Sequence, residues 1–114
     1  AAAGGSGTGV YQAAKDGGKL AIGVDSNQNH LQPGVMLTSM LKRVDVAVYN
    51  ALKAHKPGVT VLGLKEGGVD VALDEHNAKL LTPAMLSKVD AVKVDIIRGK
   101  IKVADFTDNA SCTY

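Results

Sequence analysis

Glycines crowd the start of the chain and form the first pattern that could bind a ligand. Residues 4–9 read GGSGTG and lead into a segment whose apolar spacing predicts a short helix over 9–16, capped by Thr8. Glycine lets a backbone approach a ligand closely, and the N–H groups at a helix start attract an anion or a polar acceptor. The density of glycines favours a ligand-facing backbone loop over a plain connector.

The spacing of these glycines separates several kinds of loop. A dinucleotide-binding fingerprint needs G-x-G-x-x-G with an acidic residue about 20 positions further on. Here G-x-G-x-G is followed by Asp25, so the match is partial, and no strand precedes the loop in this sequence. A P-loop is excluded because Val10 stands where Lys is required. The nucleophile elbow G-x-S-x-G is excluded because Thr8 stands two residues after Ser6, where Gly is required.

Asp25 lies at the carboxyl end of an expected strand and Lys42 at the junction of an expected strand and helix, which are the places where α/β proteins bind ligands. Asp25 follows the apolar run 20–24, and its carboxylate can accept hydrogen bonds from vicinal hydroxyls such as those of ribose. Capping of its own loop is an equally open role. Lys42 and Arg43 fall in the first turn of an expected helix, where the helix dipole disfavours cations by about 0.3–1 kcal/mol. We therefore take Lys42 as a ligand-binding candidate and assign Arg43 to a solvated surface.

No other side chains form a catalytic or metal-binding pattern. A calcium loop beginning at Asp25 is rejected because His30 and Met36 occupy the positions that require Gly and Glu. The three histidines lack ligand spacing, and Asp74–Glu75 is assigned to a turn at the surface. The single cysteine, Cys112, excludes an internal disulfide and a multi-cysteine zinc site. We expect no metal, no cofactor and no catalysis.

Composition excludes several classes of protein. The chain has 114 residues, with 13 Lys and Arg against 11 Asp and Glu, and the small net charge of +2 argues against nucleic-acid binding. Aromatic residues make up 4% and are too scattered for a base-stacking platform. No apolar run approaches the ~20 residues of a membrane span. The opening AAAGGSGTG lacks the features of a signal peptide.

The patterning predicts strands that alternate with helices. Such alternation is typical of an α/β protein with a mainly parallel sheet. In these sheets ligands bind beyond the carboxyl ends of strands. By position, both the glycine loop and the loop that starts at Asp25 are therefore candidates for ligand binding. The expected helices cover 9–16, 41–55 and 83–98, and the expected strands cover 20–24, 35–38, 59–64, 69–73 and 101–103.

Four blocks of the sequence closely resemble the C-terminal part of the basic membrane protein family. These proteins are substrate-binding lipoproteins of bacterial ABC importers, with purine nucleoside receptors as their best-known members. The resemblance covers roughly residues 1–103 and leaves a tail at 104–114 outside it. The blocks read AAGGSGTGVYQAAKDGGKLAIGVDSNQ, PGVMLTSMLKRVDVAVYNALK, TVLGLKEGGV and IIRGKIKV.

This resemblance implies a type I periplasmic-binding-protein architecture, in which two α/β lobes close on a ligand. The chain would form its C-terminal third. Residues 1–34 would belong to the second lobe, 35–58 would supply a strand and helix of the first lobe, and 59–103 would return to the second. The remainder of the protein would carry the signal peptide, the lipidated cysteine and the aromatic residues that sandwich a purine base.

The resemblance also implies roles for individual residues. It places Asp25 against ribose hydroxyls and Lys42 near the same sugar, which are positions that local chemistry also singles out. His30 stands where many family members carry an aromatic or acidic residue. The backbone that the resemblance places at the cleft belongs to Gly4, Gly5 and Ser6.

These expectations combine into one function with two alternatives. The chain is expected to belong to a solute-binding protein that delivers a nucleoside, in first place a purine nucleoside, to an ABC permease at the bacterial cell envelope. Its partners would be that permease and the missing N-terminal portion of the same protein, with no nucleic acid. The first alternative is a fragment of a dinucleotide-dependent oxidoreductase. The second is a fragment that binds no ligand and assembles with itself through exposed sheet edges.

Overall fold

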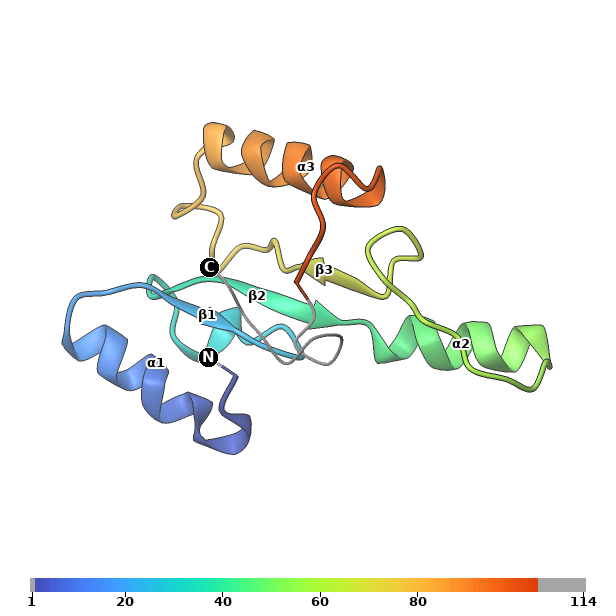
Figure 1. The fold of residues 1–114 in the computed structure, drawn as a ribbon. Coiled ribbons are helices and arrows are strands. Elements are labelled where there is room, and N and C mark those ends of the chain that lie inside the picture. The colour runs from blue at the N-terminus through green and yellow to red at the C-terminus, as the bar shows by residue number, and fades with distance from the viewer. Residues whose placement is uncertain (1, 105–114) are drawn as a thin grey trace.

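Helices and strands alternate along the chain, as Figure 1 shows. The structure, a computed structural model, describes residues 2–104. The predicted α/β class is confirmed. The elements are η1 (Gly4–Ser6), α1 (Gly7–Asp16), β1 (Ala21–Gly23), η2 (Asn29–Leu31), β2 (Met36–Lys42), α2 (Val44–Ala54), β3 (Val69–Val71) and α3 (Pro83–Ile97).

The sheet has three strands in the order β1-β2-β3. β1 runs parallel to β2, with Ala21 opposite Met36, as the sequence predicts. β2 and β3 are antiparallel, with Lys42 opposite Val69, so the sheet is mixed rather than mainly parallel. The physical reason is the path between them: α2 continues away from the sheet instead of running back along it, so no crossover returns the chain to the start of β2 (Figure 1).

The pairing with β3 also corrects the boundary between β2 and α2. The sequence predicts a strand over 35–38 and a helix from residue 41, but β2 continues to Lys42 and α2 begins at Val44. The backbone N–H of Arg43 donates to the carbonyl of Gly68 at 2.9 Å, one step beyond the Lys42–Val69 pair. Lys42 is therefore the last residue of a strand and does not belong to the first turn of a helix.

Two predicted strands, 59–64 and 101–103, are wrong. Val59 and Val61 are 97% and 84% exposed, and no described residue supplies a backbone hydrogen bond to 59–62. β-forming side chains need a neighbouring strand to pack against, and this segment has none within the described residues. The N–H of Ile101 instead donates to the carbonyl of Asp95, which continues the end of α3.

The described core lies where α1 packs against β1 and β2. Tyr11, Ala21 and Met36 are its buried members, and Ala14 and Val35 pack against them. Burial of a Tyr or Met side chain contributes roughly 1.5–3 kcal/mol, so these contacts attach α1 to the sheet. The predicted tail beyond residue 104, with Cys112, lies outside the described residues.

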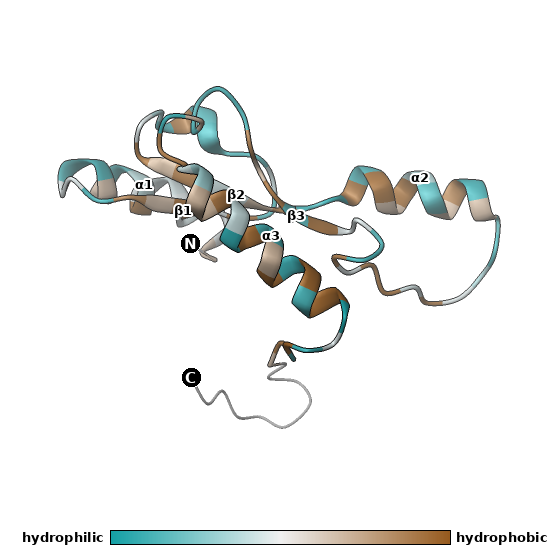
Figure 2. Cartoon of the chain, turned by 90° about the horizontal axis from the view of Figure 1, so that it is seen from above, coloured by the Kyte–Doolittle hydropathy of each residue, from teal (hydrophilic) through white to brown (hydrophobic). Residues whose placement is uncertain are grey.

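The other two long helices are more exposed. α2, all of whose residues are described, has no buried residue and extends away from the sheet (Figure 1). Figure 2 shows apolar residues along both α2 and α3. α3 is held to β3 by an ion pair of 2.7 Å between Lys93 and Asp70, and Thr82 caps it through the N–H of Met85. Across the described part of the chain, no helix has both the length and the apolar character needed to cross a membrane.

Candidate functional site

Asp25 and Lys42 lie together beyond the carboxyl end of β1. The Nζ atom of Lys42 is 3.0 Å from Oδ1 of Asp25, and the Lys42 backbone N–H donates to the Asp25 carbonyl at 2.8 Å. The two side chains are 59% and 58% exposed. Ion pairs this exposed contribute about 0–1 kcal/mol, so the pair does little for stability. It leaves a carboxylate and an ammonium side by side and open to a ligand.

The backbone at Asp25 is held in an uncommon conformation. Its φ of 73° lies in the left-handed region, which few residues other than Gly enter, although Asp and Asn tolerate it best. Such strain persists only where the surroundings fix it, and it concentrates at functional sites. This turn directs the chain from β1 into the loop that follows and brings the Asp25 carboxylate to Lys42.

The glycine turn stands apart from this pair. Gly4, Gly5 and Ser6 form the short helix η1 before α1 and are all exposed. Because α1 runs back along β1, its N-terminal end lies on the same side as the carboxyl end of β1 (Figure 1). No hydrogen bond or ion pair among the described residues joins the turn to Asp25 or Lys42. Of the five predicted site residues, the structure thus pairs two and leaves three as a separate turn.

Arg43 makes contacts within its own segment. Its guanidinium donates to both carboxylate oxygens of Asp45, with Nη2 at 2.8 Å from Oδ2. This hydrogen bond raises the pKa of Arg43 and lowers the pKa of Asp45 to about 2. The pair lies at the start of α2, where an aspartate is favourable to the helix dipole. Arg43 is therefore engaged beside the helix and is not part of the Asp25–Lys42 pair.

A buried polar network behind Asp25 was missed by sequence reasoning. Asn29, Ser39 and Asn77 are each 0% exposed. Ser39 Oγ donates to Asn29 Oδ1 at 2.8 Å and accepts the N–H of Gln28 at 3.0 Å, so β2 holds the loop directly. Gly23 leaves room for this contact, because a Cβ there would lie 2.5 Å from Ser39 Oγ.

Asp74 joins the same network from the segment after β3. Its Oδ2 accepts hydrogen bonds from the side-chain amides of Asn27 at 2.6 Å and Asn29 at 3.1 Å, and its Oδ1 accepts the N–H of His76. The Asn27 hydrogen bond is the largest cause that lowers the pKa of Asp74. The predicted turn role of Asp74 is confirmed, but the residue also ties two distant segments together. Two features of the sequence could have indicated this network: the amide-rich segment 27–29 and a serine inside an apolar strand.

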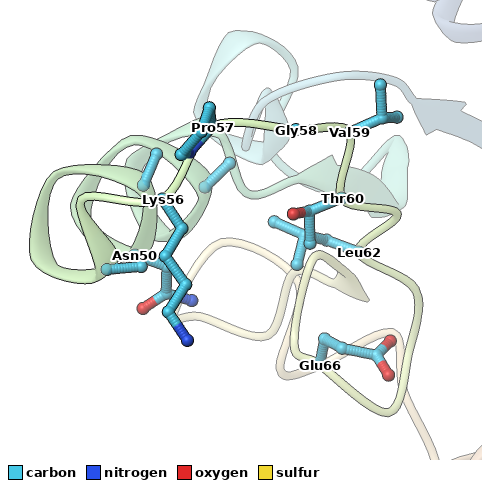
Figure 3. Close-up of a pocket in the computed structure, with 11 residues that line it drawn as sticks. Asn50, Lys56, Pro57, Gly58, Val59, Thr60, Leu62 and Glu66 are labelled. Atoms are coloured by element: carbon cyan, nitrogen blue, oxygen red, sulfur yellow. The ribbon is translucent and has the colours of Figure 1, made fainter.

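Two hollows of the described surface lie beside α2, and one of them reaches the predicted site residue Lys42. An open pocket of about 650 Å³ lies between α2 and residues 56–62, with Asn50 and Lys56 on one wall and Thr60 and Leu62 on the other (Figure 3). A smaller hollow of about 400 Å³ reaches Lys42 from the β3 side. In the part of the chain that the structure describes, no group of His, Cys, Asp and Glu could hold a metal ion.

Comparison with known proteins identifies the family. The model of a family described as ABC transporter substrate-binding protein PnrA-like matches residues 1–107. The chain belongs to this family. The resemblance to basic membrane proteins is thereby confirmed, and the PnrA-like family is one of substrate-binding proteins rather than of enzymes.

Curated relatives of the PnrA-like chain come from several organisms. Basic membrane protein D of Borreliella burgdorferi (strain JD1) is 38% identical over an alignment of 112 positions, which covers 90% of this chain and 33% of that protein. The CD4+ T-cell-stimulating antigen of Listeria monocytogenes serovar 1/2a is 36% identical over an alignment of 124 positions, which covers 91% of this chain and 34% of that protein. An uncharacterized lipoprotein of Pyrococcus furiosus is 48% identical over 58 residues, 46% of this chain and 15% of that protein. The chain spans about a third of the length of the first two.

Proposed function

We propose that this chain supplies part of a nucleoside-binding cleft, in first place for a purine nucleoside, in a solute-binding protein that serves an ABC permease at the cell envelope. The observation that carries the proposal is the exposed Asp25–Lys42 pair at the carboxyl end of β1. Ionised carboxylates accept two hydrogen bonds, which suits the vicinal hydroxyls of ribose, and an adjacent ammonium donates to their oxygens. Membership of the PnrA-like family and the names of its lipoprotein relatives support the transport role and the envelope location.

The direct test is calorimetry of the full-length protein with inosine, adenosine and guanosine. Asp25→Asn keeps a residue that tolerates the left-handed backbone and removes the charge. A hydrogen bond to a charged group contributes about 1.5–3 kcal/mol, so the substitution is expected to weaken binding about 10- to 150-fold. Asp90→Asn, on the exposed surface of α3, is the matched control and should leave affinity unchanged.

Two outcomes would contradict this proposal. Absence of binding to any nucleoside at millimolar concentration would exclude the ligand class. A fluorescence change on titration with NAD(H) would instead favour the dinucleotide alternative. Lys42→Gln should also weaken nucleoside binding, whereas Lys88→Gln on α3 should not.

The two-lobe arrangement is part of the same proposal. Residues 1–34 and 59–103 would belong to the second lobe and 35–58 to the first, where the preceding part of the full-length protein would cover α2. The support is that Val44, Val48 and Leu52 are each more than half exposed and recur every four residues, so they share one helix face. A chain about a third as long as its relatives leaves ample sequence to cover that face.

Substitutions on the apolar face of α2 test which segment packs against it. Val48→Asp should lower the unfolding temperature of the full-length protein, while Asn50→Asp, on the opposite side of α2, serves as the control. In the isolated 114-residue chain both variants should behave alike, because the face is open there. An oligomer of the isolated chain in light scattering would mean that a second copy covers the face, and it would contradict the proposed docking of the preceding segment.

A further inference from the structure

The loop that carries Asp25 is held by one backbone hydrogen bond from Lys42 and by side chains outside the predicted site. The Asp25 carbonyl accepts the N–H of Lys42, and the next two anchors lie on either side of the loop. Ser39 Oγ bonds to the Gln28 N–H and to the buried Asn29 side chain on the β2 side. On the opposite side of the loop, Asp74 Oδ2 accepts hydrogen bonds from the side-chain amides of Asn27 and Asn29.

Asp74 is the member of this network best suited to hold the loop. Both side-chain amides that donate hydrogen bonds to Asp74 belong to the loop. Hydrogen bonds to an ionised carboxylate are roughly twice as strong as those between neutral groups. Asn77 fixes Asp74 in turn, since its Oδ1 accepts the Asp74 N–H at 2.9 Å. The Asn77 amide donates to the carbonyls of Leu37 and Ala72 at 3.0 and 2.9 Å, which attaches this turn to the sheet.

The conformation of Asp25 requires such support. A residue with a Cβ in the left-handed region is strained and keeps that conformation only when its surroundings over-determine it. The exposed ion pair with Lys42 is too weak to do so. The anchors at Asn27 and Asn29 follow Asp25 by two and four residues, close enough to fix the direction in which the chain leaves it.

We propose that Asp74 is a positioning residue that holds loop 25–29, and through it the Asp25 carboxylate, in the conformation that meets a ribose. The inference rests on the proposed function for the identity of the ligand. It adds a residue from the segment after β3 to a site whose predicted members all precede α2. Asp74 touches no ligand in this proposal and acts only through Asn27 and Asn29.

Amide hydrogen exchange in the full-length protein tests the positioning step without a ligand. Asp74→Ala should raise the exchange rate of the Lys42 amide, which reports the Lys42–Asp25 backbone bond, at least tenfold. The Lys19 amide, bonded to Ala14 at the end of α1, should not change. Asp70→Ala removes another carboxylate that accepts a hydrogen bond, from Lys93, and is the matched control that should leave the Lys42 amide protected.

Ligand discrimination gives the second readout. If Asp25 meets the ribose hydroxyls, Asp74→Ala should weaken inosine binding at least tenfold and reduce the preference for inosine over 2′-deoxyinosine. The swap Asn27→Asp with Asp74→Asn keeps an amide facing a carboxylate and should restore both affinity and preference. Asn27→Ala, at an exposed position, provides a milder variant if Asp74→Ala fails to fold.

The outcomes separate the two claims. Unchanged Lys42 exchange in Asp74→Ala or Asn27→Ala overturns the positioning role, whatever the protein binds. Faster exchange at Lys19 as well, with equal losses for inosine and 2′-deoxyinosine, overturns it in favour of general destabilisation. Selective exposure of the Lys42 amide in a protein that binds no nucleoside supports the positioning role and contradicts the proposed function.

Discussion

The two ends of β2 lead into very different surroundings. At its start, Met36 is buried against Tyr11 and Ala21, and at its middle Ser39 holds the neighbouring loop through buried hydrogen bonds. Just past its end, α2 and residues 55–61 are largely exposed, with apolar side chains facing solvent. The first region is stabilised by contacts within the chain, and the second presents a surface suited to contacts from elsewhere. Lys42 lies at the border between them.

Truncation of apolar side chains should show the largest difference between the regions. Met36→Ala is expected to lower the free energy of unfolding by about 2–5 kcal/mol because Met36 is fully buried. Leu52→Ala on α2 should change it by less than about 0.5 kcal/mol in the 114-residue chain. Urea titration followed by circular dichroism measures both. Similar losses of stability in the two variants would mean that Leu52 is packed as firmly as Met36, and they would contradict the difference between the two regions.

Two glycines near the proposed ligand site should respond differently to substitution by alanine. Gly23→Ala is expected to destabilise by about 1–3 kcal/mol, since the added methyl group would collide with Ser39 Oγ. Gly5→Ala meets open space and should leave stability unchanged. If the glycine turn faces the ligand as proposed, Gly5→Ala should instead weaken nucleoside binding in calorimetry. A stable protein with unaltered affinity would place the turn outside the cleft.

The Tyr11 hydroxyl offers a test within the packed region. This oxygen is buried and has no hydrogen-bond partner among the described residues. An unpaired buried hydroxyl is unfavourable, so Tyr11→Phe should raise the free energy of unfolding by about 1 kcal/mol. Thermal unfolding of the two proteins measures the change. If Tyr11→Phe instead lowers the free energy of unfolding, the Tyr11 hydroxyl has a polar partner in the protein.

Acid should weaken the network around Asp74. The pKa of Asp74 lies below its ordinary value, so its stabilising contribution is present above about pH 3.8 and is lost as the pH falls through the lower, folded-state pKa. The groups that face it are the side-chain amides of Asn27 and Asn29, the backbone N–H of His76 and the His76 side chain, and each of them favours the charged carboxylate. The stability difference between the wild-type protein and Asp74→Asn should therefore shrink below that pH. A constant difference from pH 7 to 2 would contradict an ionised Asp74.

The parts of the fold that the sequence predicts well carry local signals. Thr82 and Pro83 mark the start of α3, and Gly17 follows the end of α1. Segment 59–64 shows the opposite case, because valines favour a strand only when a partner strand is present, and pairing is not a local property. The same reason hid the length of β2, which depends on its pairing with β3.

The candidate site divides in the same way. Asp25 was predicted from the end of a strand and Lys42 from a cation in the first turn of an expected helix, and the structure joins them because the loop after β1 turns onto the last residue of β2. Asp74 was assigned to a turn, which is correct, but its contacts with Asn27 and Asn29 cross more than 40 residues. Asn and Ser have no periodicity that marks burial, so a single sequence gives little warning of such a network.

The bond between the Arg43 N–H and the Gly68 carbonyl means that residues 44–67 leave the sheet and return to it at one point. For protein engineering, these residues amount to an insertion in a β-hairpin. A tight turn that joins Arg43 to Gly68 would preserve the ladder between β2 and β3, and the removed segment could vary in length without disturbing the strands. The same junction is a natural place to insert a reporter domain whose signal follows what α2 contacts.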